Sequence, residues 1–137
     1  MNRPRILLVD DVPEVLEYCK ALLAGEYDIV GSASNGAGAI AAANKLQPDV
    51  IVLDISMPGL NGIEVAKQLR GSRCPAAIVF VSADDDLVGD ALRAGGSAYV
   101  SKSRVRSDLG TAIAEAMAGR LFVSISDDSD HRRRPRF

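Results

Sequence analysis

The chain has 137 residues, of which 47% are hydrophobic and 25% are charged. This length suits one ordinary domain, and the composition excludes a wholly disordered or fibrous protein. The sequence has no run of about 18 apolar residues, and the apolar run after its basic start, Ile6 to Val9, is too short for a signal-peptide core. We therefore expect one core, no membrane span and a cytoplasmic location.

The formal net charge of −2 hides a difference between the body of the chain and its C-terminal end. Residues 1–130 hold 12 Lys and Arg residues against all 18 acidic residues, which gives −6, whereas residues 131–137 hold four Arg and no acid. An acidic body repels nucleic-acid backbones. Nucleic-acid binding by the domain itself is therefore not expected.

Five apolar runs of strand length alternate with helical stretches. The predicted strands are Ile6 to Val9, Ile29 to Val30, Val50 to Leu53, Ala77 to Val81 and Tyr99 to Val100. The predicted helices are Val12 to Leu23, Gly36 to Leu46, Gly62 to Gly71, Asp86 to Gly95 and Val105 to Met117. This alternation is typical of a doubly wound α/β fold, here a five-stranded parallel sheet with five helices. Residues 1–124 would form this domain, and residues 125–137 a mobile basic tail.

Polar side chains follow the predicted strands where each one ends. Asp10 and Asp11 follow the first strand, Asp54 the third, Ser82 the fourth and Lys102 the fifth. Because the carboxyl ends of parallel strands meet at one edge of the sheet, these five side chains are expected to converge. Taken singly, each has a simpler interpretation as a surface-loop residue.

Asp11 in particular has a second interpretation. It precedes a predicted helix and Glu14 follows three residues later, a spacing typical of a capping box. A helix cap and a site ligand both remain open for Asp11.

Clustered carboxylates repel one another unless they share a cation. With oxygen ligands and no His or Cys nearby, Mg²⁺ is the ion that such a site favours. Lys102 adds a positive charge to that of the Mg²⁺ ion, so a phosphoryl group is the expected ligand of the site.

Four stretches carry a family resemblance. They are RILLVDD at Arg5 to Asp11, DVIVLDISMPGLNGIEV at Asp49 to Val65, IVFVSA at Ile78 to Ala83 and RAGGSAYVSK at Arg93 to Lys102. Over about residues 4–123 the sequence resembles the receiver domain of two-component response regulators, and MPGLNG at Met57 to Gly62 is most similar to receivers of the narL/fixJ type. The resemblance implies a flavodoxin-like sheet with strand order 2-1-3-4-5.

The resemblance also implies a role for each acidic residue. Asp54 would accept a phosphoryl group from the phosphohistidine of a histidine kinase or phosphotransfer protein. Asp11, Asp54 and the backbone carbonyl of Ser56 would bind Mg²⁺ directly, and Asp10 would bind it through a water molecule. The domain would assist its own phosphorylation and dephosphorylation without being an enzyme.

Two further residues would act on the phosphoryl group, and a third would respond to it. By the resemblance, Ser82 would hydrogen-bond a phosphoryl oxygen and Lys102 would neutralise its charge, while Tyr99 would be the aromatic switch residue. The responding surface would be built from the fourth helix, fifth strand and fifth helix, about residues 86–118. Two positions depart from the family pattern: Ser82 replaces the commoner Thr, and Ser103 follows Lys102 where Pro is usual.

The output is open among several alternatives. Only about 19 residues follow Ala118, whereas a helix-turn-helix domain needs roughly 50, so we expect a stand-alone receiver that acts on a protein partner or as a homodimer. The first alternative is a receiver fragment of a DNA-binding transcriptional regulator. A flavin-binding electron carrier is weaker, because Asp10 and Asp11 stand where a phosphate loop is needed. An aspartyl-phosphate phosphatase would need a second Asp where this chain has Ser56.

Overall fold

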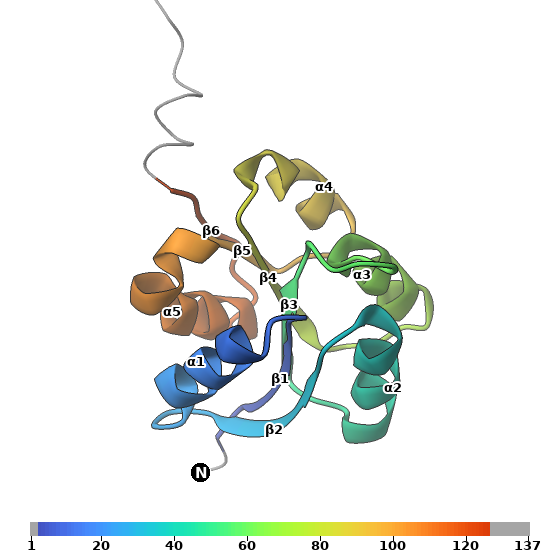
Figure 1. The fold of residues 1–137 in the computed structure, drawn as a ribbon, viewed down its shortest axis with the longest axis horizontal. Helices are drawn as coiled ribbons and strands as arrows, with labels where there is room; N and C mark the ends of the chain where they lie inside the picture. Colours follow the sequence, from blue (N-terminus) through green and yellow to red (C-terminus); the bar gives the residue numbers. More distant parts are fainter. Residues whose placement is uncertain (1–2, 127–137) are drawn as a thin grey trace, which may run out of the picture.

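A six-stranded parallel sheet with helices on both faces makes up the computed structural model, which describes residues 3–126 (Figure 1). The strand order is β2-β1-β3-β4-β5-β6. The strands are β1 (Arg5–Val9), β2 (Asp28–Ala33), β3 (Val50–Asp54), β4 (Ala77–Ser82), β5 (Ala98–Ser101) and β6 (Phe122–Ser124). The α-helices are α1 (Pro13–Leu23), α2 (Gly36–Leu46), α3 (Gly62–Gly71), α4 (Val88–Arg93) and α5 (Val105–Met117), and two short 3-10 helices, η1 (Asp85–Leu87) and η2 (Lys102–Arg104), precede α4 and α5. None of the helices in this part of the chain is long and apolar enough to cross a membrane.

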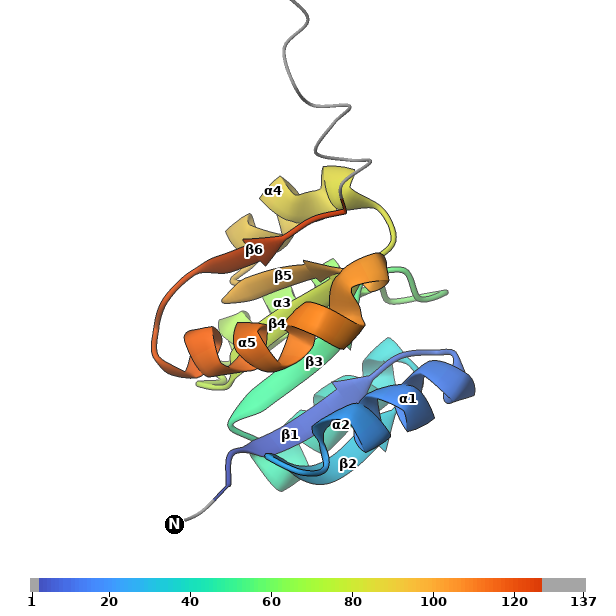
Figure 2. The ribbon, with the colours of Figure 1, turned by 90° about the vertical axis from the view of Figure 1, so that its left-hand side faces the viewer.

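The core consists of two apolar layers, one on each face of the sheet. Along β1, Leu7 and Val9 belong to the layer under α2, α3 and α4, whereas Ile6 and Leu8 belong to the layer under α1 and α5 (Figures 1 and 2). Alternate side chains of a strand point to opposite faces, so a strand covered on both faces must be apolar throughout. This explains the continuous apolar runs in the sequence.

The doubly wound parallel fold predicted from the sequence is confirmed, but its strand count of five was wrong. A sixth strand, β6, pairs in parallel with the outer edge of β5. Its three residues carry too weak a pattern to stand out, and its pairing depends on the edge that β5 offers. Most of the predicted tail, residues 127–137, lies outside the described residues. Its first two residues, Ile125 and Ser126, pack against the domain.

The start of α1 also differs from the prediction. The residue before the helix is Val12, it forms no side-chain cap, and Pro13 occupies the first helical turn. Proline has a φ angle preset for this position and lacks the N–H that would need a partner. The predicted capping box of Asp11 and Glu14 was therefore wrong, which leaves the Asp11 side chain available to the sheet edge.

The start of α3 is held tightly against the end of β3. Asn61 and Glu64 form a reciprocal capping box, with two hydrogen bonds of 2.9 Å between side chain and backbone. The Gly62 N–H donates to the Ile55 carbonyl over 2.9 Å. A Cβ at Gly62 would collide with the Asp54 carbonyl oxygen and lie 2.8 Å from the Ile55 Cα. The absence of a side chain here lets the helix approach the strand that carries Asp54.

Replacing Gly62 by Ala should destabilise the domain. The added methyl group meets backbone atoms that cannot move aside, so we expect a loss of about 2 kcal/mol or more in the free energy of unfolding, measured by urea denaturation. The control is Gly71→Ala at the other end of α3, where a Cβ would meet nothing within 4 Å. That variant should be neutral, or more stable by up to about 1 kcal/mol. Equal effects of the two substitutions would contradict this account.

Candidate functional site

The polar side chains predicted to converge do lie at one edge of the sheet. Asp10 follows β1 directly, Asp54 and Ser82 are the last residues of β3 and β4, and Lys102 follows β5. The register brings these ends level, with Asp54 opposite Val81 and Ser82 opposite Ser101. The parallel topology alone therefore assembles the site.

Three carboxylates form an acidic cluster at this edge. One oxygen atom each from Asp10, Asp11 and Asp54 lies within 4.8 Å of the others. The side chain of Asp54 is only 1% exposed, and its Oδ2 atom accepts no hydrogen bond from the described residues. A buried carboxylate oxygen without a donor is costly, and a cation would satisfy it. The all-oxygen donor set and this bare oxygen both fit a hard divalent ion such as Mg²⁺.

Lys102 provides the positive charge in the site. Its Nζ atom lies 3.6 Å from Oδ2 of Asp10 and 3.6 Å from Oδ1 of Asp54, so it faces both carboxylates without favouring either. The backbone holds the same two carboxylates in place: the Val12 N–H donates to Asp10 over 2.9 Å and the Ser56 N–H donates to Asp54 over 3.2 Å. The peptide bond between Lys102 and Ser103 is trans.

The environment of Asp54 changes its protonation. Burial first, and the neighbouring charge of Asp10 second, raise the pKa of Asp54 from 3.8 to about 6, although Lys102 and the Ser56 N–H act in the opposite direction. Both causes penalise the charged carboxylate. Without a cation, the charged carboxylate of Asp54 is therefore destabilised at neutral pH, and we call it a strained anion in this sense.

Ser82 and Tyr99 meet at the loop that follows β4. Both side chains are fully buried. The Tyr99 hydroxyl donates to the Asp84 carbonyl over 2.7 Å, and the Asp84 N–H donates to Ser82 Oγ over 3.0 Å. Burial raises the pKa of Tyr99 to about 12, so the hydroxyl remains a donor. The ring of Tyr99 thus points inward, and one residue, Asp84, is bonded to both of these side chains.

No sequence pattern singles out Asp85, the residue that follows. Asp84, Asp85 and Asp86 form an acidic run, yet Asp85 is 2% exposed and accepts two hydrogen bonds from Ser126. A run of three acids predicts a solvated loop, and no local signal marks the middle one as buried. Its partner lies 41 residues away in the sequence.

Comparison with known proteins identifies this arrangement. Residues 6–114 match the family model described as the response regulator receiver domain. The chain belongs to this family. It is therefore a receiver domain, a signalling domain of two-component systems, as the four sequence stretches indicated.

Relatives and solved structures agree with this assignment. The nitrate/nitrite response regulator protein NarL of Escherichia coli K12 is 39% identical over 123 residues, which cover 87% of this chain and 57% of the relative. The signal receiver domain of a putative response regulator NarL from Mycobacterium tuberculosis superposes with a TM-score of 0.82 at 30% identity, over 88% of this chain and all of that one. A LuxR-family two-component response regulator from Aurantimonas gives a TM-score of 0.85 at 30% identity, over 97% and 100% of the two chains. The receiver spans only about half of the length of curated relatives such as NarL.

Asp54→Asn should stabilise the metal-free receiver above pH 6. The raised pKa means that the folded state keeps a proton that the unfolded state loses between about pH 4 and pH 6, so wild-type stability falls as the pH rises through this range. The amide carries no charge and avoids this loss. We expect a gain of about 2 kcal/mol at pH 8 that shrinks towards zero near pH 4, measured by urea denaturation in EDTA.

The exposed Glu17→Gln provides the control, because it also removes one negative charge but from a side chain that is 74% exposed. It should change stability by less than about 0.5 kcal/mol at both pH values. An Asp54→Asn protein that is less stable than the wild type at pH 8 would contradict the strained-anion account.

Proposed function

We propose that Asp54 accepts a phosphoryl group from the phosphohistidine of a histidine kinase or phosphotransfer protein, in a Mg²⁺-dependent reaction. The observation that carries this proposal is the bare Oδ2 of Asp54, buried beside two other carboxylates and facing Lys102. A carboxylate has two oxygen atoms, so one oxygen of Asp54 can bind the cation while the other attacks phosphorus. The expected cytoplasmic location stays a prediction.

Each residue has a task in this reaction. Asp10, Asp11, Asp54 and the backbone carbonyl of Ser56 would hold the metal ion, which supplies charge neutralisation at the phosphoryl oxygens when bound. The Asp54 oxygen forms the new bond to phosphorus as the bond from phosphorus to the imidazole nitrogen breaks. The electron pair of that bond stays on the imidazole nitrogen, and the imidazole leaves in its neutral form because the other ring nitrogen of the phosphohistidine already carries a proton. Lys102 stabilises the negative charge on the transferring group.

The output would be a change in binding surface. A phosphoryl group on Asp54 offers Ser82 a strong acceptor, and Ser82 and Tyr99 are both linked to Asp84. The change would then reach the surface formed by α4, β5 and α5, where we place the contact with a downstream protein or a second copy. The alternative that this receiver serves a transcriptional regulator is supported by the transcriptional regulatory protein LiaR of Bacillus subtilis, which is 38% identical over 84% of this chain and 56% of its own length.

The phosphorylation of Asp54 can be tested directly. The wild-type protein, incubated with phosphoramidate and Mg²⁺, should gain about 80 Da in intact mass spectrometry, the mass that one phosphoryl group adds. Asp54→Asn should gain nothing, and EDTA should abolish the wild-type gain. Asp28→Asn, at the exposed start of β2 and away from the carboxyl ends of the strands, is the matched control and should behave as wild type. A gain that persists in Asp54→Asn would refute the proposal.

Lys102→Ala should slow phosphorylation far more than it affects folding. The side chain is 31% exposed and faces charge that develops in transfer, so we expect a rate about a hundredfold lower under the same conditions. Lys20→Ala removes a Lys paired with Glu17 on the surface of α1 and should leave the rate unchanged. A normal rate in Lys102→Ala would exclude the assigned role.

A further inference from the structure

The surface expected to respond to phosphorylation is partly covered by the chain itself. After α5 the chain turns back, and β6 runs along the outer edge of β5 (Figure 2). Its register pairs Phe122 with Ala98, Val123 with Tyr99 and Ser124 with Val100. The edge of β5 is therefore already occupied by a strand of the same chain.

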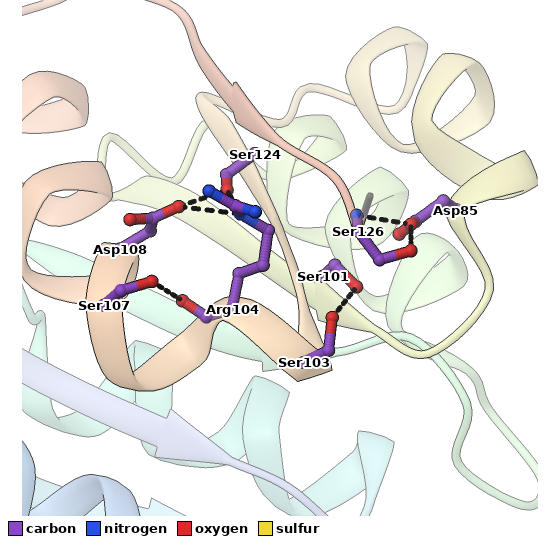
Figure 3. A network of polar contacts seen from close by, with 8 residues as sticks. All are labelled: Asp85, Ser101, Ser103, Arg104, Ser107, Asp108, Ser124 and Ser126. Carbon is purple, nitrogen blue, oxygen red and sulfur yellow. Dashed lines mark hydrogen bonds and ion pairs between the residues drawn. The ribbon is translucent and has the colours of Figure 1, made fainter. Parts of the chain in front are cut away.

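A side-chain network attaches this strand to α5 (Figure 3). Ser124 is buried and its hydroxyl donates to Asp108 Oδ2. Arg104 Nε lies 2.8 Å from Ser124 Oγ and 3.0 Å from Asp108 Oδ2, so both partners contact the same guanidinium. The hydrogen bond from Ser124 is the main reason that the pKa of Asp108 is lowered. The C-terminal end of β6 is therefore held by hydrogen bonds to the Arg104–Asp108 ion pair as well as by apolar contacts.

A second attachment joins the end of the segment to the loop after β4. The N–H and the hydroxyl of Ser126 both donate to Oδ2 of Asp85, each over 3.0 Å (Figure 3). Asp85 directly follows Asp84, the residue bonded to Ser82 and Tyr99. Ile125 packs against the apolar layer under α4. The C-terminal segment and the two predicted switch residues therefore hold the same short loop.

We propose that residues 122–126 form an intramolecular strap that covers the edge of β5 and is released when Asp54 is phosphorylated. The inference rests on the proposed function. The Ser82 hydroxyl donates to the Asp84 carbonyl over a long 3.4 Å. A phosphoryl group on Asp54 competes with that carbonyl for the Ser82 O–H, because a charged oxygen is the better acceptor. Once Ser82 turns towards it, the loop at Asp84 and Asp85 loses one of its supports and the anchor of Ser126 shifts. The edge of β5 is then exposed only in the phosphorylated state.

The coupling must act in both directions. If phosphorylation disfavours the docked strap, then weakening the strap must favour phosphorylation by the same factor. This reciprocity separates a coupled strap from a strand that merely completes the sheet. A structural strand would change stability without changing the phosphorylation equilibrium.

Hydrogen–deuterium exchange of the full chain tests the release. With phosphoramidate and Mg²⁺, the amides of residues 122–126 should exchange about tenfold faster than in the unphosphorylated protein, a typical size for such coupling. Intact mass of the same samples reports the phosphorylated fraction. Ser126→Pro removes both donors to Asp85, and Ser124→Ala removes the hydroxyl bonded to Asp108. Each variant should show fast exchange before phosphorylation and should bind beryllofluoride with Mg²⁺, a reversible mimic of the phosphoryl group, about fivefold or more tightly than the wild type.

Ser32→Ala is the matched control, since Ser32 is an exposed residue of β2, the edge strand on the opposite side of the sheet. It should match the wild type in both measurements. A protein that gains phosphate while exchange at residues 122–126 stays unchanged would overturn the strap and leave the proposed function intact. An unaltered beryllofluoride affinity in both strap variants would do the same. The absence of any mass gain would instead refute the proposed function, and the coupling with it.

Discussion

The burial of the Asp54 carboxylate beside Asp10 is the constraint on which the rest of this receiver depends. Two like charges share a dry position at the end of the central strands, and one oxygen of Asp54 has no donor among residues 3–126. Lys102, 3.6 Å from each carboxylate, offsets only part of this repulsion, as the pKa of Asp54 near 6 shows. A divalent cation would offset this surplus of negative charge.

The fold places this unfavourable group where it cannot move away. Asp54 ends a strand that is buried along its whole length, and α3 is held against its last peptide through Gly62. The capping box of Asn61 and Glu64 fixes where that helix begins. This packing keeps the Asp54 side chain at 1% exposure, where the charged form is disfavoured.

The sequence could predict the parts of the site that depend on topology. Strand ends follow from apolar runs, and in a parallel sheet strand ends determine where Asp10, Asp54, Ser82 and Lys102 lie. Asp11 shows the limit of local patterns: its spacing from Glu14 suggested a capping box, yet Pro13 starts the helix. The proline sets the start of the helix, and the spacing of Asp11 and Glu14 alone could not show this.

The contacts of the C-terminal segment could not be predicted for a different reason. Strand β6 has three residues, one of them, Val123, 41% exposed, and no hydrophobic pattern can be read from so few positions. Its hydrogen bonds join Ser124 to Asp108 and Ser126 to Asp85, which lie 16 and 41 residues away in the sequence. Pairs so far apart in the sequence form only because the tertiary structure brings them together, so they can be recognised only in the structure.

The short length of this segment bears on whether it can respond to phosphorylation. A ligand or modification shifts an equilibrium only by the difference in its interaction with the two states, about 1–3 kcal/mol in typical allosteric coupling. A long, deeply packed edge strand would be too stable to be displaced by that amount. Strand β6 has three paired residues, and Ser124 and the following Ser126 add polar contacts that are each worth on the order of 1 kcal/mol, so a coupling of this size equals the loss of one or two such contacts. Ser126 is bonded to Asp85, and the neighbouring residue Asp84 is bonded to Ser82. A change in the hydrogen bonds of Ser82 on phosphorylation is therefore only one residue away from the contact that holds Ser126. A short strand attached close to Ser82 and Tyr99 suits a strap whose docking on the edge of β5 depends on phosphorylation.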